Sequence, residues 1–336
     1  MSPTPRDVPT NLYKSISPLI GKVLENRRLT ANDRPPENDV RHIVLSSDGL
    51  SYLPGQSVGV VPDGYDARTG KHQKLRLYSV SSESKGDHKD GKTVSVVVVR
   101  HFWREAEIPE VPLAGVCSKY LCDCDVGEKV RITGPVGKRF LLPLDFRSRD
   151  LIFVATGTGI APYRGMLKEM FDQNYQGKVF LFFGVRYADT LLYDDEFRSY
   201  VDRPNFRYIT ALSREAEQNP YPNEIPTAAN KMYVQVRLWQ HRVEIGESPA
   251  SRRVRLKARL SWIRNTGFTM IGSTFLFPTR GSSFKTGAFT APRAKRTSDW
   301  KTGESSGLTA IPATELSTIA SSARRRNRRG AHSYPV

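Results

Sequence analysis

The stretch Leu151-Ile-Phe-Val-Ala-Thr-Gly-Thr-Gly-Ile-Ala-Pro-Tyr-Arg164 decides how this chain is organised. Its first five residues, Leu151 to Ala155, are all apolar, which is typical of a strand buried on both faces. A glycine-rich turn follows, and a helical pattern then runs from Tyr163 to Phe171. The stretch therefore predicts a strand, a tight turn and the start of a helix.

The turn in this stretch has the composition of a phosphate-binding loop. Gly157 and Gly159 let the backbone approach an anion without an intervening Cβ, and Pro162 suits a first helical turn with outward-pointing N–H groups. A bound diphosphate is the natural ligand of such a turn. An ordinary strand-to-helix connection explains it equally well, because the third glycine of the dinucleotide fingerprint is absent.

Length and charge divide the chain into unlike parts. With 336 residues it is long enough for two or more domains. Its formal net charge of +17 is concentrated in residues 236–336, which hold 19 Lys and Arg against 5 Asp and Glu. Nucleic acid, an anionic membrane or an acidic protein therefore become candidate partners, and they must be considered separately for the two parts.

Cysteine usage and hydropathy argue against disulfide-rich, zinc-binding, membrane-spanning and secreted proteins. Cys117, Cys122 and Cys124 are odd in number and clustered, which fits neither a disulfide framework nor a zinc site, so we expect no metal and a reducing compartment. No run of 18 apolar residues exists, and the N-terminus lacks the apolar core of a secretory signal. We expect a soluble protein.

Short apolar runs separated by turn signals dominate the first 150 residues, and few helices fit there. This spacing predicts an antiparallel barrel or sandwich. A short helix at Cys117–Cys122, entered from Gly115, is the clear exception. The predicted strands are Ile20–Leu24, Val40–Leu45, Ser57–Val61, Leu75–Val80, Thr93–Arg100 and Lys129–Thr133.

Two segments of the predicted barrel carry residues suited to a flavin. Arg76 and Tyr78 alternate onto one strand face, where a guanidinium can bind a diphosphate while a phenol ring lies against the isoalloxazine. Ser79 is placed to hydrogen-bond the ring edge. Ser118 is a candidate donor at the start of the short helix. A half-exposed strand with a surface Arg and Tyr remains the alternative.

Taken together and in order, eight motifs of this sequence closely resemble the plant-type ferredoxin–NADP reductases. Such an ordered set does not arise by coincidence, and it covers about residues 8–235. The motifs are Tyr52-Leu-Pro-Gly-Gln-Ser-Val-Gly59, Leu75-Arg-Leu-Tyr-Ser79, Gly115-Val-Cys-Ser118, Thr133-Gly-Pro-Val-Gly137, Ala155-Thr-Gly-Thr-Gly-Ile-Ala-Pro162, Leu191-Leu-Tyr193, Ser213-Arg-Glu215 and Lys231-Met-Tyr-Val-Gln235.

The resemblance implies an antiparallel β-barrel FAD-binding domain over residues 1–149. Arg76 and Ser118 would hold the FAD diphosphate, Tyr78 would stack on the flavin, and Ser79 would lie near its reactive nitrogen as the catalytic residue. Trp103 stands where the family usually stacks a tyrosine on adenine, an exchange of one aromatic face for another. The remaining residues implied at this cofactor are Leu77, Val97, Val116 and Cys117.

Residues 150–235 are expected to form an α/β parallel-sheet NADP-binding domain. Strands Leu151–Ala155, Val179–Phe183 and Phe206–Leu212 alternate with helical stretches, so ligands should collect at the strands' carboxyl ends. One hydroxyl, two cations and an aromatic ring at the matching motifs suit a 2′-phosphorylated adenosine, which favours NADP over NAD. The implied nucleotide residues are Thr156, Thr158, Gly159, Ser213, Arg214, Lys231 and Tyr233.

The resemblance also implies the electron donor and the location. Ferredoxin, or flavodoxin, would be steered to the flavin edge by Lys74, Arg100, Lys119 and Lys138. Val99 occupies a position that is commonly Lys or Arg in the family, and Arg100 is the neighbour that would compensate. We expect a plastid location, at the chloroplast stroma or thylakoid surface, with peripheral association with a photosynthetic membrane complex and no specific nucleic-acid partner.

Residues 236–336 depart from the family pattern and read as a disordered, basic tail. Because composition changes within a motif, we hypothesise a shifted reading frame or an unspliced segment after Gln235, which would leave the nucleotide sheet with a bare edge. For this tail, the alternative is an Arg-rich arm that binds phosphates. For the whole chain, the alternatives are a flavin-binding protein with impaired or no reductase activity and a related diflavin or cytochrome reductase domain.

Overall fold

The computed structural model describes residues 7–66, 69–103, 112–246 and 269–272. Among these residues, no helix combines the length and apolar character that a membrane-spanning segment needs.

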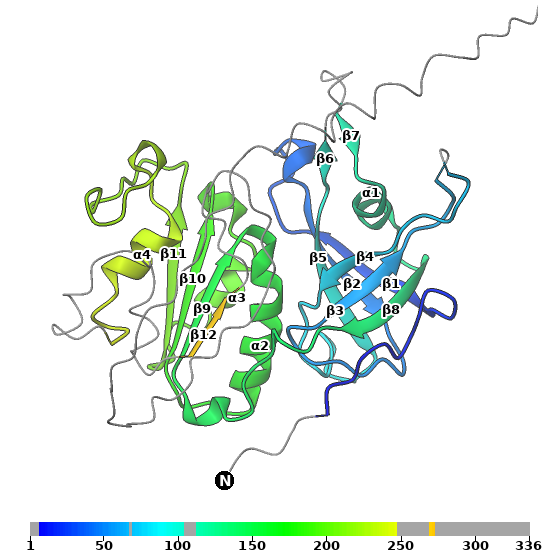
Figure 1. The fold of residues 1–336 in the computed structure, drawn as a ribbon, viewed down its shortest axis with the longest axis horizontal. Helices are drawn as coiled ribbons and strands as arrows, with labels where there is room; N and C mark the ends of the chain where they lie inside the picture. The colour runs from blue at the N-terminus through cyan, green and yellow to red at the C-terminus, as the bar shows by residue number, and fades with distance from the viewer. Residues whose placement is uncertain (1–6, 67–68, 104–111, 247–268, 273–336) are drawn as a thin grey trace, which may run out of the picture. The chain divides into compact units, whose positions relative to one another are not determined.

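The N-terminal part is a six-stranded antiparallel sheet in the order β4-β3-β8-β1-β2-β5 (Figure 1). Its two outermost strands also meet, because Val80 bridges Val96 and the Ser81 N–H donates to the Ser95 carbonyl at 2.8 Å, which closes the sheet into a barrel. All six predicted strands are confirmed. The strands are β1 Leu19–Arg28, β2 Val40–Ser46, β3 Ser57–Val61, β4 Arg76–Ser79, β5 Thr93–Val99 and β8 Lys129–Val136.

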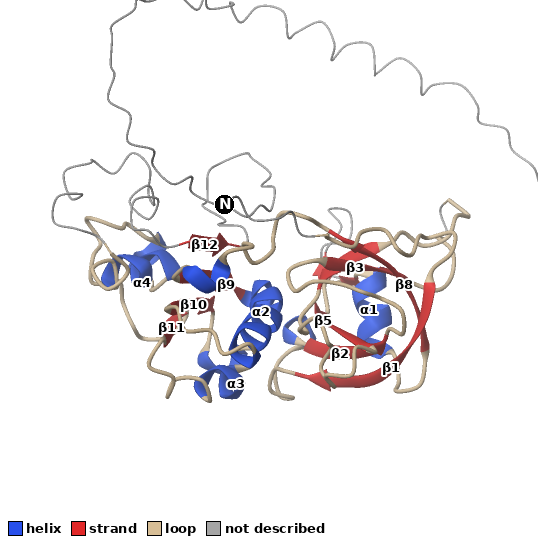
Figure 2. Cartoon of the chain, turned by 90° about the horizontal axis from the view of Figure 1, so that it is seen from below, coloured by secondary structure: helices blue, strands red, loops and turns tan. Residues whose placement is uncertain are grey.

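The predicted short helix is present as α1, Val116–Asp123, after a small hairpin of β6 (Phe102–Trp103) and β7 (Leu113–Ala114). Figure 2 shows α1 inside the outline of the barrel strands. Its apolar face, with Cys117 and Leu121, joins the inward-facing residues of the barrel in one buried cluster. The helix therefore plugs the barrel and fixes the loop that leads into it.

The second part is a parallel sheet in the order β11-β10-β9-β12 (Figure 1). Alternate residues of β9 and β10 belong to two different buried clusters, one on each face, which explains why these strands read as continuous apolar runs. The elements are β9 Leu151–Thr156, β10 Val179–Val185, β11 Phe206–Leu212, β12 Thr269–Gly272, α2 Ala161–Asp172, α3 Asp194–Arg198 and α4 Val234–Gln240. Short 3-10 turns occur at η1 Pro36–Asn38, η2 Phe146–Ser148, η3 Gly157–Ile160, η4 Ala188–Thr190 and η5 Ala228–Asn230.

The expectation that nothing after Gln235 covers the sheet is wrong. Helix α4 runs through that position and buries Val236 and Leu238 in the cluster on one sheet face. Strand β12 pairs in parallel with β9, from Thr269 against Leu151 to Gly272 against Val154. An isolated four-residue strand gives little periodicity to detect, so the sequence pattern did not reveal it. The Arg-rich end at 324–329 lies outside the described residues.

The barrel and the parallel sheet share a core. Val40 and Val97 from the barrel strands are buried in the same cluster as α2 residues such as Met166. Gly165 brings the α2 backbone close to the barrel, because a Cβ there would lie 2.3 Å from the Ser82 carbonyl oxygen. Helix α2, which begins at the glycine-rich turn, is thus packed directly against the barrel.

Candidate active site

The glycine-rich turn has the predicted strand-turn-helix form. Strand β9 ends at Thr156, the turn η3 contains the two glycines, and α2 begins with Pro162 in its first turn. Gly157 has φ +51°, a conformation that side chains rarely adopt, and nothing lies within 4 Å of the place where its Cβ would be. The glycine is therefore required by backbone conformation, and the space above it is open to a ligand.

A cavity of about 380 Å³ joins this turn to the barrel. It is lined by Ser79 from β4 and by Gly159 and Pro162 from the turn and α2. Ser79 and Gly159 were predicted site residues, and they lie 80 positions apart in the sequence, so the fold brings them to one cavity.

The loop after β8 supplies another wall of this cavity, from Val136 to Phe140. Of this loop only Lys138 was singled out from the sequence, and it was expected at the donor surface, whereas Arg139 and Phe140 were missed. The signal was the Thr133–Gly137 motif, which marks a turn but not the site that the turn faces.

The flavin candidates on β4 lie at an open edge of the barrel. Arg76, Leu77 and Ser79 are exposed, and the Arg76 guanidinium contacts only the neighbouring Lys74 and Leu75 carbonyls, so it is free of any acidic partner among the described residues. Tyr78 is half-buried against the barrel core, and its pKa is raised chiefly by burial and further by the adjacent Cys117 thiol.

Cys117 and Ser118 lie in the first turn of α1. The Cys117 thiol is buried, its Sγ is 3.9 Å from the Val60 carbonyl oxygen, and burial raises its pKa, so it stays protonated. The Ser118 hydroxyl donates to the Gly115 carbonyl at 3.1 Å and accepts from the His101 N–H at 3.2 Å. Because that hydroxyl is engaged inside its own loop, the first-turn backbone amides are the better donors for an anion here.

The other residues predicted to contact the cofactor differ in how exposed they are. Trp103 on β6 is 45% exposed and Val116 is exposed at the start of α1, so both can meet a ligand. Val97 on β5 is buried in the core cluster shared with α2, and Val99 packs against the same cluster.

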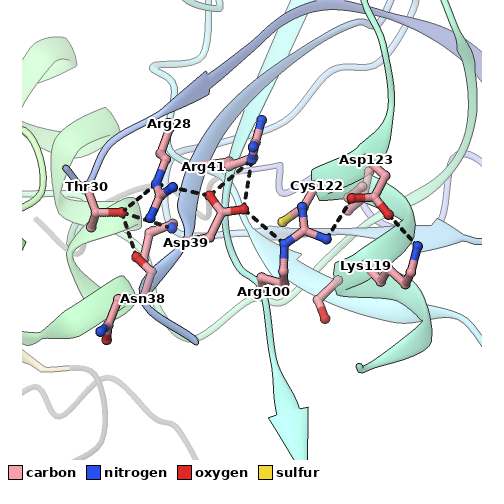
Figure 3. Close-up of polar contacts among 12 residues, drawn as sticks. Arg28, Thr30, Asn38, Asp39, Arg41, Arg100, Lys119, Cys122 and Asp123 are labelled. Carbon is pink, nitrogen blue, oxygen red and sulfur yellow. Dashed lines mark hydrogen bonds and ion pairs between the residues drawn. The ribbon is translucent and has the colours of Figure 1, made fainter. Parts of the chain in front are cut away.

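Arg100, a candidate steering residue for the donor, is paired with two carboxylates of this chain. Figure 3 shows its guanidinium between two carboxylates, with Nε 2.9 Å from Asp39 and Nη1 2.6 Å from Asp123. Lys119 also pairs with Asp123, at 2.5 Å. Of the four cations expected to steer a donor protein, Arg100 and Lys119 are thus paired with carboxylates, whereas Lys74 and Lys138 are exposed without a side-chain partner among the described residues.

Asp39, only 4% exposed, is the centre of this cluster. Besides Arg100 it contacts Arg41 at 3.1 Å and Arg28 at 3.6 Å, from strands β2 and β1 (Figure 3). A buried carboxylate needs such partners, and its three arginines tie two barrel strands and the end of β5 together.

The nucleotide candidates gather at the carboxyl ends of the parallel strands. Ser213 and Arg214 directly follow β11, and their N–H groups donate to the Val185 and Arg186 carbonyls at 3.0 and 2.8 Å. Lys231 forms an isolated antiparallel β-bridge with Gln218, and Tyr233 directly precedes α4. Thr156 and Thr158 belong to the glycine-rich turn at the same edge of the sheet.

A buried charge cluster joins α2 to the barrel, and no local sequence pattern indicates it. Arg164 is 6% exposed, and its guanidinium contacts Asp87 and Glu196, each at 2.7 Å. His42 lies 3.5 Å from Asp87 through Nε2 and 2.8 Å from the Tyr193 hydroxyl through Nδ1. Burial works against ionisation of Asp87, but His42 and Arg164 together hold the pKa of that carboxyl well below its ordinary value.

Comparison with known proteins gives the family. A model of the oxidoreductase NAD-binding domain matches residues 153–250. A ferredoxin–NADP reductase from Spirulina is 42% identical over 250 residues, covering 72% of this chain and 81% of the relative. One from Thermosynechococcus vestitus is 39% identical over 306 residues, covering 88% of this chain and 71% of the relative.

Solved structures agree. The ferredoxin-NADP+ reductase of Plasmodium falciparum superposes with a TM-score of 0.55 and 28% identity, covering 70% of this chain and 81% of that one. A variant of it in complex with 2′P-AMP gives a TM-score of 0.56 and 27% identity, covering 71% and 84%.

These matches also correct the expected end of the resemblance. The domain model extends to residue 250, and an alignment covering 88% of the chain passes well beyond residue 235. Given this identity, this coverage and the shared fold, the chain belongs to the ferredoxin–NADP reductase family.

Proposed function

We propose that this ferredoxin–NADP reductase holds FAD on the barrel and NADP(H) at the carboxyl ends of the parallel strands, and moves electrons from reduced ferredoxin to NADP+. The observation that best supports this proposal is the cavity that Ser79 of the barrel shares with Gly159 and Pro162 at the glycine-rich turn and the start of α2. One space reached from both halves suits a reaction between two ring systems held by different domains.

The barrel residues fit a flavin dinucleotide. Arg76 offers an exposed guanidinium without an acidic partner among the described residues, and Tyr78 beside it offers an aromatic face on a rigid strand. Leu77, Val97, Trp103, Val116, Cys117 and Ser118 complete the proposed cofactor set. FAD would supply the step from single electrons to a hydride. The protein's own part would be positioning, with the Ser79 hydroxyl at the cavity wall available to hydrogen-bond the flavin.

The nucleotide residues fit a 2′-phosphorylated ligand. Ser213, Arg214, Lys231 and Tyr233 combine a hydroxyl, two cations and an aromatic ring at one edge of the sheet, with Thr156, Thr158 and Gly159 at the adjacent turn. The Plasmodium relative was solved with 2′P-AMP, which supports the same chemistry for this chain. We therefore propose NADP(H) as the physiological nucleotide.

The donor is proposed to be an acidic ferredoxin, or a flavodoxin, that approaches the cavity mouth. Lys138 and Arg139 line the cavity and are exposed, and Lys74 lies two residues before Arg76. Because these three cations have no ion-pair partner among the described residues, they are better placed to steer an acidic donor than the paired Arg100 and Lys119.

A plastid location and a role in photosynthesis, with peripheral membrane association, are proposed from the sources of the relatives. Two relatives are rice chloroplast and Cyanophora cyanelle enzymes.

Domain boundaries near residues 149 and 235, and the hypothesis of a shifted reading frame in the basic tail, stay proposals. The alternative of a flavin-binding protein with impaired or no reductase activity rested on the absence, after Gln235, of the family's C-terminal catalytic part. Helix α4 and strand β12 cover the sheet in the part of the chain that the structure describes, but they do not supply those residues, so this alternative also stays a proposal.

A direct test combines a spectrum with two assays. The purified chain should show flavin absorbance, reduce ferricyanide with NADPH, and reduce NADP+ only when reduced ferredoxin is supplied. A flavin-loaded chain without either activity would leave only the flavin-binding function. A colourless chain that takes up no added FAD would overturn the proposal.

A further inference from the structure

Arg186 follows the last residue of β10 and lies beside Arg214. The Arg214 N–H donates to the Arg186 carbonyl at 2.8 Å, one step after the Ser213 N–H donates to the Val185 carbonyl at 3.0 Å. These bonds continue the parallel pairing of β10 with β11, in which Val185 is the partner of Leu212. The backbones at Arg186 and Arg214 therefore lie next to each other where both strands end.

Neither arginine has an acidic partner among the described residues, and both side chains are exposed. The nearby acids are engaged elsewhere: Asp189 pairs with Arg34, and Glu217 pairs with Arg237. The Glu215 carboxylate accepts the Ala188 N–H at 3.1 Å. Two exposed arginines without an ion-pair partner among the described residues thus come from adjacent strand ends, an arrangement that a bound anion would stabilise.

The start of α4 lies at the same edge of the sheet. A Cβ on Gly184, two residues before Arg186, would be only 2.4 Å from the Val234 Cγ2 atom. This close approach places the start of α4, which Tyr233 directly precedes, against the end of β10. An aromatic residue therefore stands at the start of α4, at the edge of the sheet where the two arginines follow their strands.

We infer that Arg186 is a further nucleotide-binding residue, whose guanidinium binds the adenosine 2′-phosphate together with Arg214. A phosphate monoester carries about two negative charges near neutral pH, so two guanidinium groups match it better than one. The inference rests on the proposed nucleotide function. It adds a second arginine to the contacts with the 2′-phosphate, so the preference for NADP+ over NAD+ does not depend on Arg214 alone.

Calorimetric titration of the FAD-loaded, full-length protein tests this, with 2′-phosphoadenosine 5′-monophosphate and adenosine 5′-monophosphate as probes. Arg186→Ala should weaken the doubly phosphorylated probe about tenfold, the scale of one charge-assisted contact, and change the other less than twofold. Arg186→Lys should recover part of the loss. Arg207→Ala, which removes an exposed cation near the opposite end of β11, is the matched control and should bind like the wild type.

The outcomes separate this inference from the proposed function. If Arg214→Ala weakens the doubly phosphorylated probe while Arg186→Ala stays within twofold of wild type, Arg186 is only a solvated surface residue and the inference fails alone. If the wild type does not prefer the 2′-phosphorylated probe, both fail. A double variant that loses more affinity than either single variant supports a phosphate shared by both arginines.

Discussion

At the scale of single residues, the arginines of this chain differ in whether a carboxylate already holds them. Arg100 is held by Asp39 and Asp123, whereas Arg76 contacts only backbone carbonyls beside it. A guanidinium that pairs with a ligand must not be neutralised beforehand, so Arg76 is available to a diphosphate and Arg100 is not.

Replacing Arg76 should therefore reduce cofactor retention. A hydrogen bond to a charged group contributes roughly 1.5–3 kcal/mol, so Arg76→Ala should raise the FAD dissociation constant about tenfold or more. Absorbance of the purified variant and titration with added FAD measure this. Lys71→Ala, an exposed cation in the preceding loop, serves as control and should stay fully yellow. Full occupancy at unchanged affinity in Arg76→Ala would contradict the assignment.

The three cysteines should be chemically inert in the native protein. Burial raises the pKa of Cys122 and of Cys124 to about 12 and also raises that of Cys117, so almost no thiolate exists at pH 8. A chromogenic thiol reagent should react with none of them within minutes under native conditions and with all three in denaturant. Rapid native reaction of one thiol would show that the barrel opens around α1.

At the scale of elements, α2 links the two halves. It starts at the glycine-rich turn and packs against the barrel through Gly165, and its second turn carries Arg164 into the buried charge cluster. Breaking a buried ion pair costs more than breaking an exposed one, because the remaining charge keeps its desolvation cost without its partner.

Loss of the Asp87 charge should destabilise the fold measurably. Asp87→Asn should lower the free energy of unfolding at pH 7 by about 3 kcal/mol, against less than about 1 kcal/mol for Asp145→Asn, which removes an exposed carboxylate from its pair with Arg149. Denaturant titrations of both variants measure this. Equal small effects would mean that Glu196 alone satisfies Arg164.

The same residue predicts how stability depends on pH. The pKa of Asp87 is lower in the folded than in the unfolded chain, so its stabilising contribution is complete above about pH 4 and is lost as the pH falls toward the folded value. Wild-type stability should therefore fall more steeply below pH 4 than that of Asp87→Asn. Parallel curves for the two proteins would contradict the depressed pKa.

At the scale of the whole molecule, β12 decides whether the outer edge of β9 in the nucleotide sheet is paired with another strand. The strand comes from far along the chain and covers the β9 edge over four residue pairs. Unpaired strand edges invite association with other chains, so this short segment protects the strand that leads into the phosphate-type turn.

Truncation tests that role. A chain ending at residue 275 should melt several degrees above one ending at residue 265, because only the longer chain retains β12. The shorter chain should also aggregate more readily, while its flavin content, a property of the barrel, stays the same. Identical melting temperatures and solubility would show that the β9 edge does not need β12. Thermal denaturation followed by circular dichroism and light scattering gives both readings.

Local sequence pattern determined much of this protein. Alternating and continuous apolar runs predict the barrel strands and β9 to β11, and the glycines at 157 and 159 predict the turn, because burial and backbone conformation at these places depend on nearby residues. Eight ordered motifs were enough for the family resemblance. The short strand β12 was missed, since four residues carry too little periodicity.

Only the tertiary structure decided which charges are paired. Arg164 meets Asp87 across 77 positions, and Arg100 meets Asp39 across 61, so no local pattern could distinguish these arginines from Arg76 or Arg186. The cavity likewise exists only because a barrel strand, the loop after β8 and the start of α2 converge on it. Pairing energies depend on distance and burial, which the chain acquires only when it folds.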